Sequence, residues 1–363
     1  MKGNRFDVHN ITGLQLDFLY LREAKVSRDV RTEWVDYAKA IGIILVVYGH
    51  VARGVKESGF NLSESLFTLV DSIIYSFHMP LFFFLSGLFF YQSFLKRGLL
   101  NLTFNKIDTI VYPYIAWTLI QGGVSILLSN YTNSDTTLQE VLSFWQPFAQ
   151  FWFLYTLFIL FVFCGLIYKI WPERFSVLLL FFCAIPYIER SFLPNVSALS
   201  SVAASLVFFV FGIVFSHYKC SLFLKARWML LATTVLFIVS QYWFHIYLGK
   251  TFIDKGAESL FLAFLSIFFV SCLSIHLSEK PSKVIVFIGT SSMAIYVMHI
   301  LTGSGARIFL SKVFGITSTS LHLGAGVAAG ILLPLLAVKI IEKLGIPYVF
   351  SAPISKIVLK SKN

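Results

Sequence analysis

The chain has 363 residues and a formal net charge of +11, but only 13% of its residues are charged and 57% are hydrophobic. With a mean hydropathy of +0.78, it is too apolar for an ordinary water-soluble domain, in which about 25% of residues are charged. We therefore expect an all-α integral membrane protein whose 39 Phe and 16 Tyr residues contact membrane lipids. The basic charge does not predict a nucleic-acid partner, because the Lys and Arg residues gather in loops on one side of the predicted bilayer.

The two ends of the chain are predicted to be cytosolic tails around one membrane domain. Residues 1–33 are charged, show no signal peptide and lead into the first apolar run, so we expect an N-terminal tail there. The membrane domain is predicted over residues 34–344, and residues 345–363 form the C-terminal tail. The cysteines are scattered without a CxxC pair, so we expect neither a disulfide nor a metal site.

The membrane domain is predicted to be a bundle of about ten transmembrane helices, since a span needs about 20 largely apolar residues. The fifth span is the shortest and contains Pro186. In chain order the predicted spans are 35–55, 66–91, 107–129, 148–168, 175–189, 200–217, 228–248, 259–277, 284–302 and 322–342.

The distribution of basic residues predicts that both termini are cytosolic. With a cytosolic N-terminus, the cytosolic segments hold 21 Lys and Arg residues and the opposite loops hold seven, while Lys39 lies within the first span. This excess follows the positive-inside rule and requires an even number of spans, N-in and C-in. The loop 130–147 contains no Lys or Arg and is expected on the outer side.

The first span contains two groups that are costly in hydrocarbon, Lys39 and His50, in the stretch KAIGIILVVYGH. Eleven residues at 100° each place both side chains on one helix face, about 16–17 Å apart along the axis. Asp36 lies one turn before Lys39 on nearly the same face. In the N-in topology, Lys39 is near the cytosolic surface and His50 is in the outer half of the bilayer.

Each of these residues also has a simpler interpretation. Lys39 is equally typical of a lysine that extends to the lipid headgroups. Asp36 favours a helix N-terminus whatever else it does. His50 is too deep to anchor the inner end, but a hydrogen-bonded packing histidine or an outer interfacial histidine stays open. Ionisable groups within a membrane are nevertheless candidates for function.

Two further spans carry polar faces at similar depth. In the second span Asp71, Tyr75 and His78 recur at helical spacing, and Ser86 lies beside a glycine where a neighbouring helix can approach. A kinked packing helix is the alternative for His78.

The ninth span places Ser292, Tyr296 and His299 on one side. Three spans therefore each bring one histidine to the outer half of the bilayer, which predicts a shared polar cavity. The glycines of GAGVAAG (324–330) have the wrong spacing for a dinucleotide loop and predict close helix packing through Gly326 and Gly330.

Four stretches together resemble the membrane acyltransferase 3 family: WVDYAKAIGIILVVYGH, FHMPLFFFLSGLFF, FWFLYTL and SSMAIYVMH. The family's hallmark is a basic residue, ten intervening residues and a histidine, which Lys39 and His50 match. The resemblance covers about residues 34–344, the expected membrane acyltransferase domain. The FHMP stretch and the chain length are similar to fucose 4-O-acetylases and exopolysaccharide O-acetyltransferases. One departure is NKIDTIVYPY in the third span, where many members have an arginine-rich motif and only Lys106 is basic here.

The resemblance implies a multi-pass O-acyltransferase of the bacterial cell inner membrane, with acyl-CoA, usually acetyl-CoA, as co-substrate and no bound cofactor. Its donor would bind at the basic inner surface through Lys39, Asp36, Lys106 and Arg97, because phosphates favour Lys and Arg. His50 would be the general base that takes a proton from a sugar hydroxyl. An acyl-histidine intermediate stays open.

The remaining polar residues have less specific roles in this hypothesis. The oxyanion formed by attack on the thioester needs hydrogen-bond donors, for which Tyr296, His299 and Ser292 are unranked candidates. His78, Asp71 and Ser86 are assigned to the acceptor side or to structure. The implied acceptor is a glycan or lipid-linked saccharide, and polysaccharide-assembly proteins are further partners.

Two other classes of function fit ten spans with an internal polar stripe. One is a transporter or flippase for lipid-linked glycans, which internal repeats would favour. The other is a structural membrane partner of polysaccharide assembly, in which the histidines only pack. The sequence does not distinguish the acceptor sugar, its hydroxyl position or the oligomeric state.

Overall fold

The fold is all-helical, as the sequence predicts. The structure, a computed structural model, describes residues 33–129, 136–189 and 197–355. Most of the predicted tail 1–33, the last eight residues of the predicted tail 345–363 and part of the loop 130–147 lie outside these ranges. Its long helices are continuous apolar runs, because only a helix satisfies the backbone polar groups of a single segment in hydrocarbon. The helical elements are α2 (Trp34–Glu57), α3 (Glu64–Leu88), α4 (Phe90–Lys106), η2 (Ile107–Val111), α5 (Tyr112–Leu127), α6 (Leu138–Leu142), η4 (Ala149–Phe151), α7 (Trp152–Ile170), η5 (Glu173–Phe175), α8 (Ser176–Ile188), α9 (Ser197–His217), η6 (Cys220–Lys225), α10 (Arg227–Tyr242), η7 (Trp243–Tyr247), α11 (Ala257–Ser278), α12 (Lys283–Thr290), α13 (Ser292–Lys312) and α14 (Thr319–Leu344).

Nine helices within the described residues are long and apolar enough to cross a membrane. The predicted fifth span, 175–189, corresponds to α8, whose 13 residues extend about 20 Å at about 1.5 Å per residue. That is shorter than the roughly 30 Å hydrocarbon core of a bilayer. The prediction that the fifth span is the shortest is confirmed at α8, and nine longer helices agree with a bundle of about ten and confirm the membrane-protein class.

Contacts at one end of the bundle join segments that the sequence predicts on the same side. We call the two ends the Trp34 end and the Glu57 end, after the first and last residues of α2. At the Trp34 end, the Tyr37 hydroxyl donates to the carbonyl of Lys280 at 3.3 Å and accepts the N–H of Ser282 at 2.5 Å. The Trp34 ring lies 6.2 Å from the Phe215 ring near the end of α9, and His217, which ends α9, lies 3.2 Å from Glu173, which precedes α8.

Segments that the sequence predicts on the outer side contact one another at the Glu57 end. The Arg307 side chain of α13 donates to the Gly54 carbonyl of α2, and the rings of Phe60 and His322 lie 4.2 Å apart. Since both Glu173 and His217 are at the Trp34 end, the chain leaves that end through α8 and returns through α9. The short α8 therefore belongs to a tenth passage, which agrees with an even number of crossings. Which end faces the cytosol stays a prediction.

Two predicted boundaries are wrong. The segment 96–106, expected as a cytosolic loop, is helical, and α4, η2 and α5 run as one stretch from Phe90 to Leu127 with a kink at Gly98. Its Lys96 and Arg97 are exposed just before the kink, where Gly98 has non-helical dihedral angles (φ 69°, ψ 169°), so neither charge is buried. The predicted span 284–302 is instead two helices, because the helical conformation is interrupted at Ser291 between α12 and α13.

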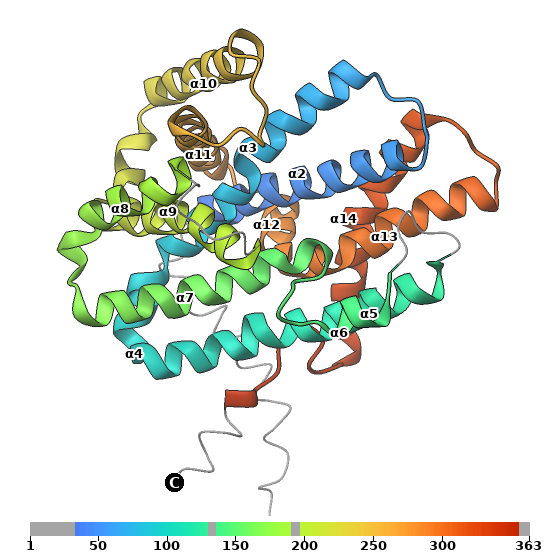
Figure 1. The fold of residues 1–363 in the computed structure, drawn as a ribbon, viewed down its shortest axis with the longest axis horizontal. Coiled ribbons are helices and arrows are strands. Elements are labelled where there is room, and N and C mark those ends of the chain that lie inside the picture. The colour runs from blue at the N-terminus through green and yellow to red at the C-terminus, as the bar shows by residue number, and fades with distance from the viewer. Residues whose placement is uncertain (1–32, 130–135, 190–196, 356–363) are drawn as a thin grey trace, which may run out of the picture.

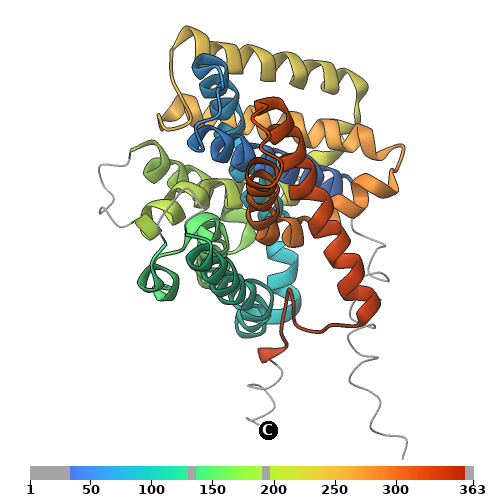
Figure 2. The same cartoon turned by 90° about the vertical axis from the view of Figure 1, so that its right-hand side faces the viewer.

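Helix α2 lies in the middle of the bundle, with α10 and α11 on one side of it and α4, α5 and α7 on the other (Figure 1). Helices α13 and α14 pack side by side, and Figure 2 shows α14 slanting along the outside of the bundle. At Gly326 and Gly330 an added Cβ would lie 2.7 Å from Val51 and 2.6 Å from Val47. The predicted close packing through these two glycines is confirmed, and the partner helix is α2.

Candidate functional site

The site is centred on His50, on the last third of α2. The rings of His50 and His299 lie 5.1 Å apart between centroids, and His299 on α13 is fully buried. His50 is only half-buried, so the residue keeps some exposed surface although its ring packs against His299. The prediction that these two helices bring their histidines together is confirmed.

Helix α3 adds the third predicted histidine and a tyrosine to the same cluster. The Tyr75 ring lies 6.4 Å from the His50 ring and meets the His78 ring edge-on at 4.5 Å. His78 is 1% exposed, and its Nδ1 is 2.7 Å from the carbonyl of Ile74 one turn earlier. Thus α2, α3 and α13 bring their histidines into one polar cluster, and a cavity shared by these residues stays a prediction.

An ion pair between α2 and α3 braces this cluster toward the Glu57 end. Arg53 donates from Nε and Nη2 to the two carboxylate oxygens of Asp71, both at 2.8 Å. Its guanidinium carbon lies 3.4 Å from the centre of the Tyr75 ring and 5.3 Å from that of Phe252. Fork-to-fork pairs of this kind fix geometry as well as charge. Sequence reasoning assigned Asp71 only loosely and missed Arg53, although Arg53 follows His50 by three residues on the same helix face.

The loop between η7 and α11 closes over this side of the cluster. The backbone N–H of Phe252 donates to the Ser72 hydroxyl at 2.7 Å, while His245 Nδ1 lies 3.0 Å from the carbonyl of Lys250. Ser72 precedes Tyr75 by one turn of α3. These bonds hold the Phe252 ring 5.3 Å from the Tyr75 ring. The sequence offers no pattern that predicts this loop contact.

Two of the predicted oxyanion donors already form hydrogen bonds to backbone carbonyls. The Tyr296 hydroxyl donates to the backbone carbonyl of Gln150 in η4, just before α7. His299 Nδ1 lies 2.7 Å from the carbonyl of Tyr296, which requires a proton on Nδ1 and leaves Nε2 as an acceptor in the neutral ring. That buried Nε2 has no hydrogen-bond partner among the described residues.

Two other predicted residues lie outside the histidine cluster. Ser292 begins α13, seven residues and about 10 Å of helix before His299. Ser86 donates to the carbonyl of Phe82 in its own helix at 2.8 Å, and it follows His78 by eight residues. Nothing in the contacts of Ser86 brings it to the cluster.

The predicted donor-side residues gather toward the Trp34 end. Lys39 Nζ lies 3.7 Å from Asp36 Oδ1, and the Lys39 side chain keeps 22% of its surface exposed. Lys106 lies close enough to Lys39 and Arg97 for their like charges to interact, and its Nζ is 3.9 Å from the centre of the Phe161 ring. Lys39 and Lys106, far apart in the sequence, therefore belong to one basic region.

Side chains fill the space between this basic region and His50. Ile43 and Val46 lie between Lys39 and His50 on the same face of α2, and they are 0% and 1% exposed. The uninterrupted α2 confirms the spacing of about 16–17 Å between the two polar groups. The route along α2 is closed by packing in this conformation.

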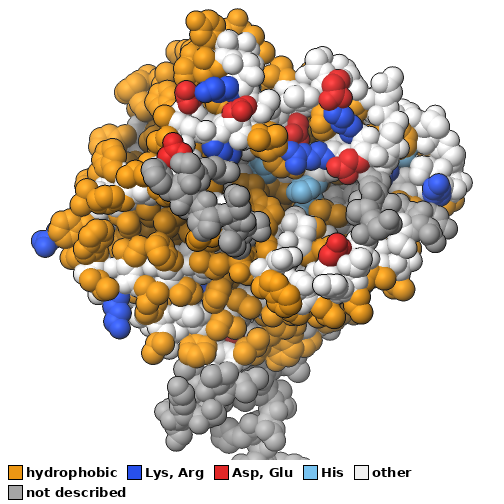
Figure 3. Space-filling view, in the orientation of Figure 1, with side chains coloured by type: hydrophobic (Ala, Val, Ile, Leu, Met, Phe, Trp, Pro, Cys, Tyr) orange, Lys and Arg blue, Asp and Glu red, His pale blue; other side chains and the backbone are white. Residues whose placement is uncertain are grey.

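Figure 3 shows that basic, acidic and histidine side chains gather near the centre of one face, whereas hydrophobic side chains cover most of its left and lower parts.

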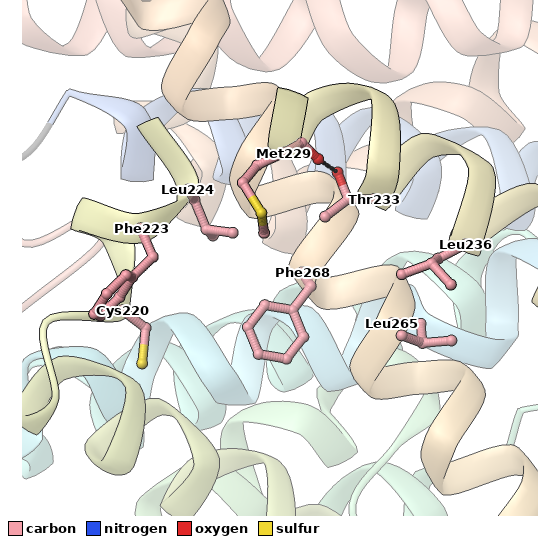
Figure 4. A pocket seen from close by; sticks show the side chains of 8 residues that line it. All are labelled: Cys220, Phe223, Leu224, Met229, Thr233, Leu236, Leu265 and Phe268. Atoms are coloured by element: carbon pink, nitrogen blue, oxygen red, sulfur yellow. Dashed lines mark hydrogen bonds between the residues drawn. The ribbon is translucent and has the colours of Figure 1, made fainter. Parts of the chain in front are cut away.

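Two pockets lie apart from these charged and histidine side chains. One, of about 310 Å³, lies between η6, α10 and α11 and has an almost entirely apolar lining that includes Cys220 and Phe268 (Figure 4). The other, of about 320 Å³, is lined by apolar and tyrosine side chains of η2, α5 and α7 and of the chain before η4. Neither is lined by Lys39 or His50, and no group in the described ranges combines three or more potential metal ligands from His, Cys, Asp and Glu.

These features define a multi-pass helical membrane protein with a braced, histidine-centred polar site between its helices. The family model for an acyltransferase domain, of the acyltransferase 3 type, matches residues 32–339. The chain therefore belongs to the membrane acyltransferase 3 family, and acyl transfer is favoured over the transporter, flippase and structural-partner alternatives. The family match covers the α2, α3 and α13 residues of the site.

A curated relative supports the same family assignment at greater distance. Glucans biosynthesis protein C of Salmonella gallinarum is 25% identical over 187 residues, which are 49% of this chain and 45% of that protein. The alignment thus spans less than half of the relative's length. No solved structure matches this chain.

Proposed function

We propose that the protein is an O-acetyltransferase of the bacterial inner membrane that uses cytosolic acetyl-CoA to acetylate a sugar hydroxyl. The acceptor is an extracytoplasmic or lipid-linked polysaccharide. The observation that carries this proposal is the half-buried His50 in one cluster with the buried His299 and His78 and with the half-buried Tyr75. Family membership supplies acyl transfer, and the imidazole of a histidine that is only half-buried is suited to accept a hydroxyl proton.

The donor binds, in this proposal, with its nucleotide phosphates at the basic region of Lys39, Lys106 and Arg97. Lysine and arginine are the side chains that recognise phosphate through charge-assisted hydrogen bonds. The pantetheine arm then extends toward His50 along the 16–17 Å that separates the two groups on α2. Because Ile43 and Val46 are packed, the arm has to part these side chains, and donor binding is coupled to a local opening of the bundle.

The acceptor reaches His50 from the Glu57 end. Arg53, Tyr75 and Phe252 offer a charged and aromatic surface of the kind that contacts sugar hydroxyls and ring faces. The name of the Salmonella relative, a glucans biosynthesis protein, supports a glucose polymer as one acceptor class to test.

The proposal is tested with radiolabelled acetyl-CoA added to inverted membrane vesicles from cells that express the full chain. Wild-type vesicles are expected to transfer label to the glycan fraction, and His50→Ala is expected to lose about 10²–10⁴-fold of that rate, the range of general-base catalysis. His217→Ala is the matched control, because His217 pairs with Glu173 at the opposite end of the bundle. Equal labelling by wild-type and His50→Ala vesicles would reject His50 as the base, and no labelling by wild-type vesicles would reject the proposed reaction.

A further inference from the structure

Acyl transfer to a hydroxyl needs a hydrogen-bond donor for the oxyanion, and the structure leaves the predicted donors unsuited to that task. The Tyr296 hydroxyl is bound to the Gln150 carbonyl. The Nδ1 of His299 is bound to a carbonyl of its own helix, so its Nε2 accepts rather than donates when the ring is neutral. Ser292 is two turns of helix from His299.

Tyr75 offers the hydroxyl that these residues do not. Its ring lies 6.4 Å from His50 and 4.5 Å from His78. Its hydroxyl oxygen is buried and has no hydrogen-bond partner among the described residues. Since buried polar groups in folded proteins are nearly always paired, an unpaired one needs an explanation. A hydroxyl kept unpaired beside the base is ready to donate to a substrate atom.

The surroundings of Tyr75 hold its ring in one position. The Arg53 guanidinium carbon lies 3.4 Å from the ring centre, and Arg53 is itself fixed by Asp71. On the α2 side, an added Cβ at Gly49 would lie 2.8 Å from Tyr75 Cε2 and 3.3 Å from its hydroxyl oxygen. The hydroxyl therefore lies against the backbone of the residue that precedes His50, and only glycine at position 49 leaves this space.

We propose, on the basis of the proposed acyl transfer, that the Tyr75 hydroxyl donates the hydrogen bond that stabilises the oxyanion. His50 takes the proton of the acceptor hydroxyl while the acceptor oxygen bonds to the thioester carbon. The carbonyl π electrons move to the carbonyl oxygen, which accepts a hydrogen bond from Tyr75. Collapse re-forms the carbonyl and breaks the C–S bond, and the CoA thiolate leaves with the proton held by His50. Tyr75 keeps its proton throughout.

Arg53 acts on this step as a positioning residue. A cation over the face of a tyrosine ring is attracted to the ring's electrons, which holds the ring and makes its hydroxyl a stronger donor. The Arg53 guanidinium has donors that Asp71 does not use, but 31% of its side chain stays exposed. The proposal assigns oxyanion contact to Tyr75 alone.

Tyr75→Phe tests the proposal in the vesicle assay with labelled acetyl-CoA. The maximal rate is expected to fall about 10²–10³-fold, the loss seen when one oxyanion donor is removed. The KM for acetyl-CoA should stay within about twofold, because the contact forms only in the transition state. The pH profile should keep its shape, since His50 is untouched. Tyr91→Phe is the control, because Tyr91 packs against Phe94 and Tyr168 away from His50.

Stability separates this role from a structural one. Removing a hydroxyl that has no partner is expected to leave the melting temperature unchanged or slightly raised, so loss of activity with retained stability supports the donor role. Gly49→Ala displaces the same ring and should lower the maximal rate in the same direction. A Tyr75→Phe protein with at least a third of the wild-type rate would overturn the proposal, as would a loss confined to KM or a shifted pH profile. Inactive wild-type vesicles would instead reject the proposed function itself.

Discussion

The two ends of the polar face of α2 are built differently. Around Lys39, the basic side chains keep partial exposure, and the distance of 3.7 Å from Lys39 Nζ to the buried Asp36 carboxylate is long for an ion pair. Around His50, rings from α2, α3 and α13 lie within 4.5 to 6.4 Å of one another, and the Arg53–Asp71 pair has two bonds of 2.8 Å. One end can adapt to a ligand, whereas the other is already arranged.

This difference suits the two tasks of an acyltransferase. A donor that enters and leaves in each turnover gains from a basic region that attracts phosphates without holding them in a rigid pocket. Stabilisation of a transition state instead requires groups that are placed before the reaction begins. Substitutions at the Lys39 end should therefore change the KM for the donor, and substitutions at the His50 end should change the maximal rate.

Among the substitutions that compare the two ends of α2, Asp71→Asn is expected to lower the maximal rate most. The amide keeps the shape but removes the charge that holds Arg53, so the Tyr75 ring loses its support. We expect the maximal rate to fall about tenfold to a hundredfold, because small displacements of catalytic groups are costly. Unfolding should become easier by about 1–2 kcal/mol, the low end for a charged hydrogen bond because Arg53 is partly exposed. The vesicle assay and thermal unfolding in detergent measure the two effects.

The KM for acetyl-CoA should be nearly unchanged in Asp71→Asn. A raised KM with a normal maximal rate would mean that Asp71 and Arg53 belong to the donor path, which would remove the distinction between the two ends of α2.

Lys39→Ala is expected to have the opposite signature. Loss of one phosphate contact by a partly exposed lysine should cost about 1 kcal/mol and raise the KM for acetyl-CoA about five- to tenfold. The maximal rate should stay within about twofold. Lys39→Arg should restore most of the affinity, and Lys169→Ala, an exposed lysine at the end of α7, is the matched control. An equal fall in maximal rate with KM untouched would contradict donor binding at Lys39.

Much of the fold follows from the sequence because hydrocarbon imposes simple rules. Long apolar runs predict nine of the helices, and the positive-inside count predicts an even number of passages, with which the contacts at the Trp34 end agree. The predicted span 284–302 is wrong because close packing interrupts its apolar run. Helix α12 ends at Thr290, where an added Cβ at the preceding Gly289 would lie 1.9 Å from the Asp36 carbonyl oxygen. Such backbone contact between helices leaves no periodic signal in either segment.

In the site too, features set by helix periodicity are predictable from the sequence, whereas features set by tertiary contacts are not. Helical spacing places Lys39 and His50 on one face and indicates similar depths for His50, His78 and His299, so the histidine cluster is predictable. Hydrogen bonds to backbone carbonyls cannot be predicted in this way. In the structure such bonds already engage the Tyr296 hydroxyl and His299 Nδ1. The role of Arg53 is not predictable either, because its pairing with Asp71 depends on how α2 and α3 cross.

The smallest effect is predicted for Glu64→Ala, which gives the sharpest test of why Asp71 matters. Glu64 also pairs with α2, through Lys56 one turn beyond Arg53, and its 2.6 Å distance is shorter than either Arg53–Asp71 bond. Yet the Glu64 side chain is 75% exposed and that of Asp71 is 10% exposed. Exposed pairs contribute about 0–1 kcal/mol, so stability should change by less than about 0.5 kcal/mol and the maximal rate should not change. A loss in Glu64→Ala as large as in Asp71→Asn would mean that any tie between α2 and α3 suffices, and that burial beside Tyr75 adds nothing.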